Sequence, residues 1–161
     1  PHPVVIKKIE KVSEVFHARF SAVQRTYLYR IQNTPFFPAL NKGKVWHIGP
    51  KLNVKKMNEA AQILLGKHDF STFRAANCQA KSPIKTLDFI QVKRKGEEVQ
   101  MLIQARSFLY HQVRNIIGTL VLVGLGKWTI SDFEKAFRAK DRKKGGQTAP
   151  AEGLFFIKVN Y

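Results

Sequence analysis

One arginine lies in an apolar segment that has no acidic residue to balance its charge. From residue 99 to residue 131 the sequence contains no Asp or Glu, and residues 107–126 are SFLYHQVRNIIGTLVLVGLG, in which Arg114 is the one charged side chain. At about 3.6 residues per turn, two apolar stripes run along this segment. The first comprises Leu109, Val113, Ile116, Leu120 and Val123, and the second comprises Tyr110, Arg114, Ile117 and Val121. Because such a helix is buried and a guanidinium stays charged, Arg114 requires an anionic partner. The partner must come from elsewhere in the fold, from a ligand, or from protein outside these residues.

Other residues with reactive side chains form weaker patterns. The pair His68-Asp69 could be catalytic, although such a dipeptide after a helix is typical of a turn and cap. Cys78 lies between polar neighbours and is interpreted as an ordinary thiol. The five His and one Cys show no metal-ligand spacing, and no glycine loop has the context of a phosphate cradle. The sequence therefore predicts no metal or cofactor site.

Two basic segments favour contact with nucleic acid, each with a structural alternative. Tyr27 and Tyr29 alternate with Arg25 and Arg30, a pattern that suits either strand packing or stacking on bases. The run at residues 140–144 is either a solvated charged loop or a phosphate contact.

The composition favours a nucleic-acid partner. The 161 residues suit one domain, and 28 Lys and Arg against 11 Asp and Glu give a net charge of +17. No exposed amphipathic helix with a basic face is evident, so we favour nucleic acid over an acidic membrane. Arg114, Asn115 and the glycines in the apolar segment argue against a membrane span. A single Cys fits a reducing, cytoplasmic location.

The spacing of apolar residues predicts an α+β fold. Strands are expected over residues 4–12, 25–31, 86–95, 99–105 and 154–161, of which the third and fourth form a hairpin. Besides the apolar segment, helices are expected from an Asn53 cap to about residue 65, followed by Gly66, and from a Ser131 cap to about residue 139. We expect a mostly antiparallel sheet with helices packed on one face. The start at Pro1, without Met and directly before a strand, suggests a fragment.

Four stretches of the sequence resemble the TruA-type tRNA pseudouridine synthases. They occur in the family's order and at similar spacing, and together they cover nearly the whole chain. They are FHARFSA at 16–22 followed by Arg25-x-Tyr-x-Tyr29, LGKHDFSTFR at 65–74, SFLYHQVRNIIG at 107–118 and TAPAEGL at 148–154. Residues 1–161 are accordingly identified as a single domain, the C-terminal half of such an enzyme.

The resemblance implies a reaction without metal or organic cofactor. In the family an aspartate attacks a uridine of the tRNA anticodon stem-loop, the glycosidic bond breaks, and the uracil rotates and rejoins the ribose through carbon five. That aspartate belongs to a Gly-Arg-Thr-Asp-Ala-Gly motif, which this chain lacks. The chain alone is therefore expected to be inactive. The resemblance also implies a homodimer that holds tRNA across both subunits.

Two residues correspond to companions of the missing aspartate. Tyr27 aligns with a tyrosine that lies against the target base and assists proton transfer, and Arg114 aligns with the basic residue that pairs with the aspartate. Alternatively, Arg114 forms a structural ion pair with Asp69, Asp88 or the C-terminal carboxylate. Contacts to the tRNA backbone are expected from the basic residues Arg19, Arg25, Lys67, Arg74 and Lys81.

Two other functions remain as alternatives. A non-catalytic tRNA- or RNA-binding module fits the charge and the strand aromatics equally well. Hydrolysis by His68 and Asp69 lacks a supporting nucleophile or metal set.

Overall fold

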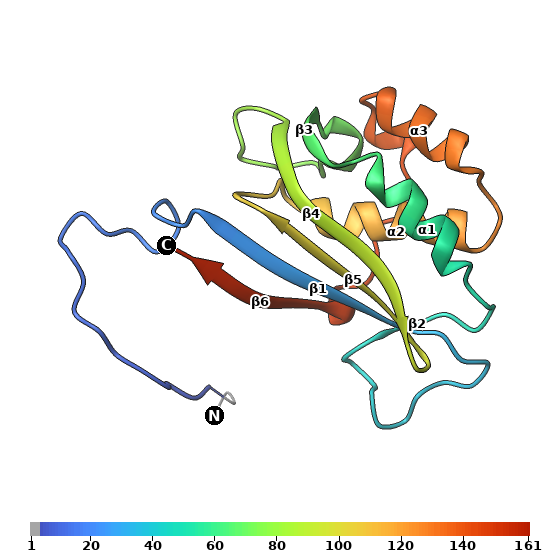
Figure 1. Cartoon of the computed structure of the whole chain (residues 1–161), viewed down its shortest axis with the longest axis horizontal. Helices are drawn as coiled ribbons and strands as arrows, with labels where there is room; N and C mark the ends of the chain where they lie inside the picture. Colours follow the sequence, from blue (N-terminus) through green and yellow to red (C-terminus); the bar gives the residue numbers. More distant parts are fainter. Residues whose placement is uncertain (1–3) are drawn as a thin grey trace.

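The computed structural model describes residues 4–161 as an antiparallel-rich sheet with helices on one face (Figure 1). In chain order the elements are β1 (Gln24–Gln32), β2 (Trp46–His47), α1 (Val54–Gln62), β3 (Gly66–Asp69), β4 (Ile84–Lys95), β5 (Glu98–Ala105), α2 (Gln112–Gly124), α3 (Ile130–Arg138) and β6 (Leu154–Asn160). The strand order is β2-β1-β5-β4-β3, and β6 pairs with the first part of β1. The β1–β2 pair is parallel and the other described pairs are antiparallel. The predicted α+β class is confirmed.

The β4–β5 hairpin was predicted with its correct inward face. Gly96 occupies the turn with φ +58°, a conformation that glycine adopts without steric penalty. On β5 the side chains of Val99, Met101 and Ile103 are fully buried, as their alternation indicated. The two-residue period therefore directs this strand's apolar side to the helices.

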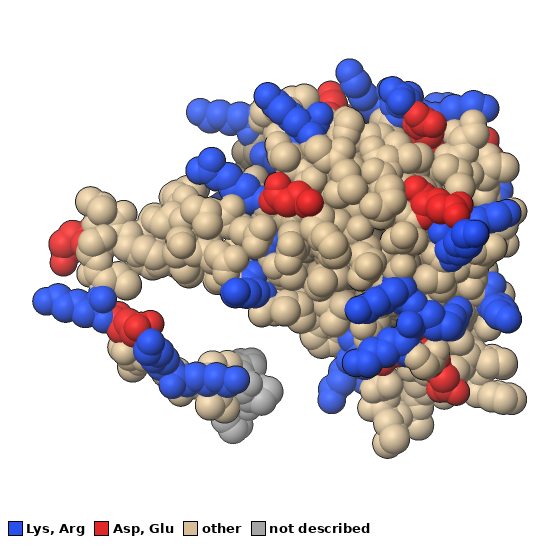
Figure 2. Space-filling model, in the orientation of Figure 1, with Lys and Arg blue, Asp and Glu red and all other residues tan. Residues whose placement is uncertain are grey.

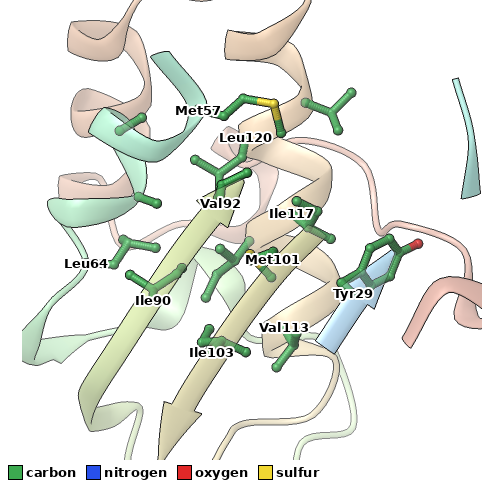
Figure 3. Packing of buried hydrophobic residues seen from close by; sticks show 14 of the residues in the cluster. Tyr29, Met57, Leu64, Ile90, Val92, Met101, Ile103, Val113, Ile117 and Leu120 are labelled. Atoms are coloured by element: carbon green, nitrogen blue, oxygen red, sulfur yellow. The ribbon is translucent and has the colours of Figure 1, made fainter. Parts of the chain in front are cut away.

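Helix α2 forms the centre of the core. Val113, Ile116, Leu120 and Val123 on its predicted face are at most 4% exposed. Figure 3 shows Val113, Ile117 and Leu120 of α2 packed over Met101 and the neighbouring strands. Each such side chain contributes roughly 1.5–3 kcal/mol when buried. No helix within residues 4–161 is long and apolar enough to cross a membrane.

The strand expected at residues 4–12 is wrong. These residues have no regular structure, and Val4, Val5, Ile6 and Ile9 are 74–86% exposed. A strand needs a neighbour to satisfy its backbone N–H and C=O groups, and within residues 4–161 no sheet edge pairs with this segment. An apolar pattern alone therefore does not make a strand here.

The C-terminal end of the first predicted helix differs from the expected one. Asn53 caps α1 as predicted, because its Oδ1 accepts from Lys56 N at 3.1 Å. However, α1 ends at Gln62, and Gly66 opens β3, so His68 and Asp69 lie on a strand rather than in a turn.

The cap of α3 is also corrected. Thr129, not Ser131, precedes the helix, and its Oγ1 accepts from Asp132 N at 3.1 Å while Asp132 Oδ2 accepts from Thr129 N at 2.9 Å. This reciprocal capping box satisfies two otherwise unpaired N–H groups at the start of the helix.

The segment from residue 145 to residue 153 lies directly against α2 and β1. A Cβ on Gly118 would fall 1.9 Å from the carbonyl oxygen of Gln147, and one on Gly153 would fall 2.7 Å from the Tyr29 ring. Ala149 N also donates to the backbone oxygen of Arg114 at 3.2 Å. Position 118 therefore needs a glycine so that the backbone at Gln147 can pass this close to α2.

We expect Gly118→Ala to destabilise the protein by on the order of 3 kcal/mol, because the new methyl group displaces the backbone at Gln147. Urea unfolding followed by tryptophan fluorescence measures the change. Gly49→Ala is the matched control, because no atom lies closer than 3.9 Å to its added Cβ, and it should shift the free energy of unfolding by less than about 0.5 kcal/mol. Equal stability of the two variants would contradict the close passage.

Candidate functional site

A pocket of about 1020 Å³ lies where β1 begins and α2 begins. Its walls come from residues 19–22, the start of β1, the loop at 77–80, the connection from β5 to α2 and the first turn of α2. Four of the candidate site residues line it, namely Tyr27, Arg114, Arg19 and Arg25. The fold thus brings together residues that are almost 100 positions apart.

The pocket is basic and contains no acidic side chain. Its ionisable cations are Arg19, Arg25, Lys85, Arg106 and Arg114, and no Asp or Glu is among its lining residues. Figure 2 shows that Lys and Arg also outnumber Asp and Glu over the visible face of the molecule. Among residues 4–161, no three His, Cys, Asp or Glu side chains gather as metal ligands would. The site is therefore suited to attract an anion.

Tyr27 is held between two phenylalanines on the side of β1 that also carries Tyr29. Its ring makes an edge contact with Phe108 at 5.4 Å and a tilted contact with Phe156 at 5.1 Å, measured between ring centroids. Partial burial raises the pKa of the Tyr27 hydroxyl, although Arg25 opposes this effect. At neutral pH the hydroxyl is thus protonated and able to donate a hydrogen bond.

Arg114 is held by neutral groups. Its Nε donates to the carbonyl oxygen of Ala149 at 2.6 Å, and its Nη1 lies 3.2 Å from His111 Nε2. Within residues 4–161 the salt bridges are Lys8–Glu10, Arg30–Glu98 and Arg138–Glu134. The alternative ion pairs with Asp69, Asp88 or the C-terminal carboxylate are therefore not formed. The Arg114 side chain is therefore oriented by hydrogen bonds, but its positive charge has no anionic partner among the described residues.

Asn115 fixes the start of α2 from the other side. Its buried amide donates from Nδ2 to Phe73 O at 2.9 Å, and its Oδ1 accepts from Thr148 Oγ1 at 2.6 Å and from Arg142 Nη2 at 3.1 Å. Because the Asn115 side chain is fully buried, its bonds to Phe73, Thr148 and Arg142 fix the position of the first turn of α2.

The other predicted basic residues have different surroundings. Arg25 donates to the backbone oxygens of Arg19 and Arg106, and so joins the chain before β1 to the end of β5. Arg74 donates from Nη2 to the carbonyl oxygens of Cys78 at 3.1 Å and Ala80 at 2.7 Å. Lys67, Arg74 and Lys81 are not part of the pocket lining.

Sequence reasoning missed Lys85, Arg106, Phe108 and His111. The first two are ordinary members of a basic composition, and Phe108 belongs to an apolar run, so spacing alone does not distinguish them. His111 was missed because the sequence pattern does not show its left-handed backbone conformation, φ +58°, or its contact with Arg114.

The Cys78 thiol lies on the pocket wall, where its sulfur accepts from the backbone N–H of Tyr110 at 3.3 Å. Burial raises the pKa of this thiol. The N–H groups of Tyr110 and Ala80, together with the Arg74 guanidinium, lower the pKa more strongly, so it lies below the usual value.

Comparisons with known proteins agree on one family. Residues 60–161 match the family model described as tRNA pseudouridine synthase. The chain is 54% identical over its full length to tRNA pseudouridine synthase A of Rhodospirillum centenum, 55% to that of Paramagnetospirillum magneticum and 52% to that of Xanthobacter autotrophicus. It spans 66%, 63% and 66% of the length of these relatives, respectively.

We expect Arg74→Met to slow alkylation of Cys78 at pH 8, because loss of the guanidinium raises the thiol pKa and leaves less thiolate. The rate of reaction with iodoacetamide, measured against pH, tests this. Lys81→Met removes a neighbouring positive charge that makes no bond to the loop, and it should leave the rate nearly unchanged. An equal effect of both variants would show that Arg74 acts only through general charge.

Proposed function

The chain belongs to the tRNA pseudouridine synthase family, and on that premise we propose that it supplies part of an active site that isomerises uridine in the tRNA anticodon stem-loop. The observation that carries this proposal is the shared pocket of Tyr27 and Arg114, which is basic and has no acidic lining residue. The pocket offers an arginine to a carboxylate and an aromatic side chain to a base.

In the proposed reaction the attacking aspartate comes from protein outside these residues. The bond from ribose C1′ to uracil N1 breaks, and a bond from C1′ to C5 replaces it. The bond that the aspartate forms to the nucleotide is broken again in the same cycle, which releases the free carboxylate. A proton leaves C5 and one is gained at N1, so the product is an isomer of the substrate. The described residues would position the carboxylate and the base for these steps.

Arg114 would hold the attacking carboxylate in its ionised form. A guanidinium within about 4–6 Å favours the charged state of a carboxyl group. Because the partners of Arg114 in this chain are neutral, its charge is available to such a group. Its attachment to the backbone of Ala149 would fix the direction of approach.

Tyr27 would lie against the target base. Aromatic side chains stack on bases that have left the helical stack, and Phe108 and Phe156 restrict the Tyr27 ring to one orientation. Its protonated hydroxyl is then available as a proton donor, which is the role that the family resemblance implies.

The surrounding cations would help to bind tRNA. Phosphate contacts from residues such as Arg19, Lys85 and Arg106 supply affinity with little sequence information. Such contacts would offset the few kcal/mol needed to extrude a uridine from its stem. The family resemblance further supports a homodimer that binds tRNA across both subunits, in the cytoplasm.

The test is pseudouridine formation on an unmodified tRNA transcript by the full-length protein that contains this chain, mapped by position. We expect product in the anticodon stem-loop, and Arg114→Met should slow its formation by about 100-fold or more, since the attacking carboxylate would lose the cation that stabilises its charge. The Kd for tRNA should change by less than about threefold.

Arg138→Met is the matched control, because it removes an exposed arginine of α3 that pairs with Glu134 outside the pocket. It should leave rate and affinity unchanged. tRNA binding by the wild-type protein without any product would favour the RNA-binding module. Equal losses of rate and affinity in Arg114→Met would contradict the carboxylate-pairing role.

Tyr27→Phe should lower kcat by about 100-fold while leaving the fold and the Kd for tRNA nearly intact, since only the hydroxyl is removed. Single-turnover kinetics with saturating enzyme separate the chemical step from product release. Phe156→Leu keeps the Tyr27 hydroxyl and tests the packing of its ring, and it should have a smaller effect. Unchanged turnover in Tyr27→Phe would refute a proton-transfer role.

A further inference from the structure

We propose that His111 is a positioning residue for Arg114, and that protonation of its imidazole releases the Arg114 side chain and switches the pocket off. The inference rests on the proposed function for its effect on turnover. The contact itself lies within the described residues and is testable without turnover.

The contact between the two side chains fixes the state of the imidazole. Arg114 Nη1 lies 3.2 Å from His111 Nε2. A guanidinium has only N–H donors and no acceptor, so a hydrogen bond forms only if Nε2 is the acceptor. His111 is therefore neutral in this arrangement, with its proton on Nδ1. An imidazolium has donors on both nitrogens and would repel Arg114.

The backbone of His111 is held in an uncommon conformation to make this contact. His111 precedes the first residue of α2 with φ +58° and ψ +10°, and its side chain forms no cap bond. A non-glycine residue in the left-handed region costs about 1 kcal/mol or more and concentrates at functional sites. Its ring stacks on Tyr110 with centroids 3.8 Å apart. The stack and the backbone together direct the imidazole to Arg114.

His111 and Ala149 hold Arg114 from two sides. The carbonyl oxygen of Ala149 accepts from Nε at 2.6 Å, and His111 accepts from Nη1. A guanidinium has five N–H bonds, so three are free of the acceptors found among residues 4–161. With both hydrogen bonds present, the plane of the guanidinium is fixed, and so are the directions of its three remaining N–H bonds. Without His111, the plane can turn about the remaining bond to Ala149.

The electrostatic surroundings keep His111 neutral near pH 7. Burial and then the charge of Arg114 lower the pKa of His111. The titratable and charged groups that line the same pocket are Arg19, Arg25 and Tyr27 from the start of the chain and β1, Cys78 from the loop, Lys85 from β4, Arg106 and Tyr110 from the connection to α2, and Arg114. None is a carboxylate, so no group in the pocket lining favours the imidazolium.

The first experiment compares His111→Gln with His111→Ala in the full-length protein. Both substitutions place an ordinary side chain at the same positive φ, so they share the backbone strain. Only Gln retains an acceptor, which does not titrate. We expect His111→Ala to lower kcat about tenfold or more with an unchanged Kd for tRNA. His111→Gln should keep kcat within about threefold at pH 7.5 and lose less activity than the wild type as the pH falls to 5.5.

His68→Asn is the control for a histidine outside the pocket lining, and it should keep the wild-type pH profile. The proposal is overturned if Gln and Ala are equally impaired at pH 7.5, because the acceptor would then be irrelevant. It is also overturned if the pH profile of His111→Gln matches that of the wild type.

The second experiment follows the His111 ring by NMR titration and needs no turnover. The pKa of His111 should lie below the usual value for histidine and should rise in Arg114→Met. A His111 pKa that is insensitive to Arg114→Met overturns the positioning contact, whatever the activity. The expected shift in a protein that makes no pseudouridine would uphold the contact and overturn the proposed function instead.

Discussion

The close passage of the segment from residue 145 to residue 150 over α2 is the constraint on which the site depends. The missing side chain at Gly118 lets the backbone of Gln147 touch the helix, and this contact brings Ala149 and Pro150 into place. Ala149 then accepts from Arg114, and Pro150 accepts from the Tyr29 hydroxyl at 2.7 Å. The packing of this segment against α2 therefore also determines where the Arg114 side chain lies.

This arrangement explains why stretches far apart in the sequence act together. Asn115 belongs to the apolar helix, Thr148 to the segment before β6 and Phe73 to the turn after β3, and their hydrogen bonds meet at one buried amide. Each stretch leaves a polar group that only another stretch can satisfy. The pocket therefore depends on long-range bonds between these stretches as much as on the residues that face it.

The sequence was informative where a period or a charge imbalance governs the structure. The inward face of β5, the burial of α2 and the lack of an acidic neighbour for Arg114 all follow from residue types along one segment. The sequence was misleading where a strand needs a partner strand, or where two residues could each cap the same helix. Residues 4–12 have a strand's composition but pair with no edge of the described sheet, and the helix cap is Thr129, which forms a capping box with Asp132, rather than Ser131.

The site itself was predictable only in part. Tyr27 and Arg114 could be named from motifs, and the structure places both in one pocket. The groups that hold Arg114 could not be predicted from the sequence. The carbonyl of Ala149 belongs to the backbone and is present in every residue type, and the left-handed conformation at His111 is a property of the folded backbone. The sequence also did not indicate that Arg25 and Arg74 bind backbone carbonyls with their guanidinium N–H groups, and their contacts to tRNA stay a prediction.

The pairing of β1 with β6 has a consequence for the order in which the molecule forms. Gln24 and Asn160 are joined across 136 positions, and the carbonyls that hold Arg114 and Tyr29 lie just before β6. Contacts between residues so far apart in sequence form slowly, because closing the large loop between them costs conformational entropy before the contact stabilises the structure. During synthesis on the ribosome the β4–β5 hairpin and α1 can form early, but the pocket must wait until β6 has emerged. The bond that orients Arg114 therefore depends on a segment that is synthesised after α1, α2, α3 and the strands β1 to β5.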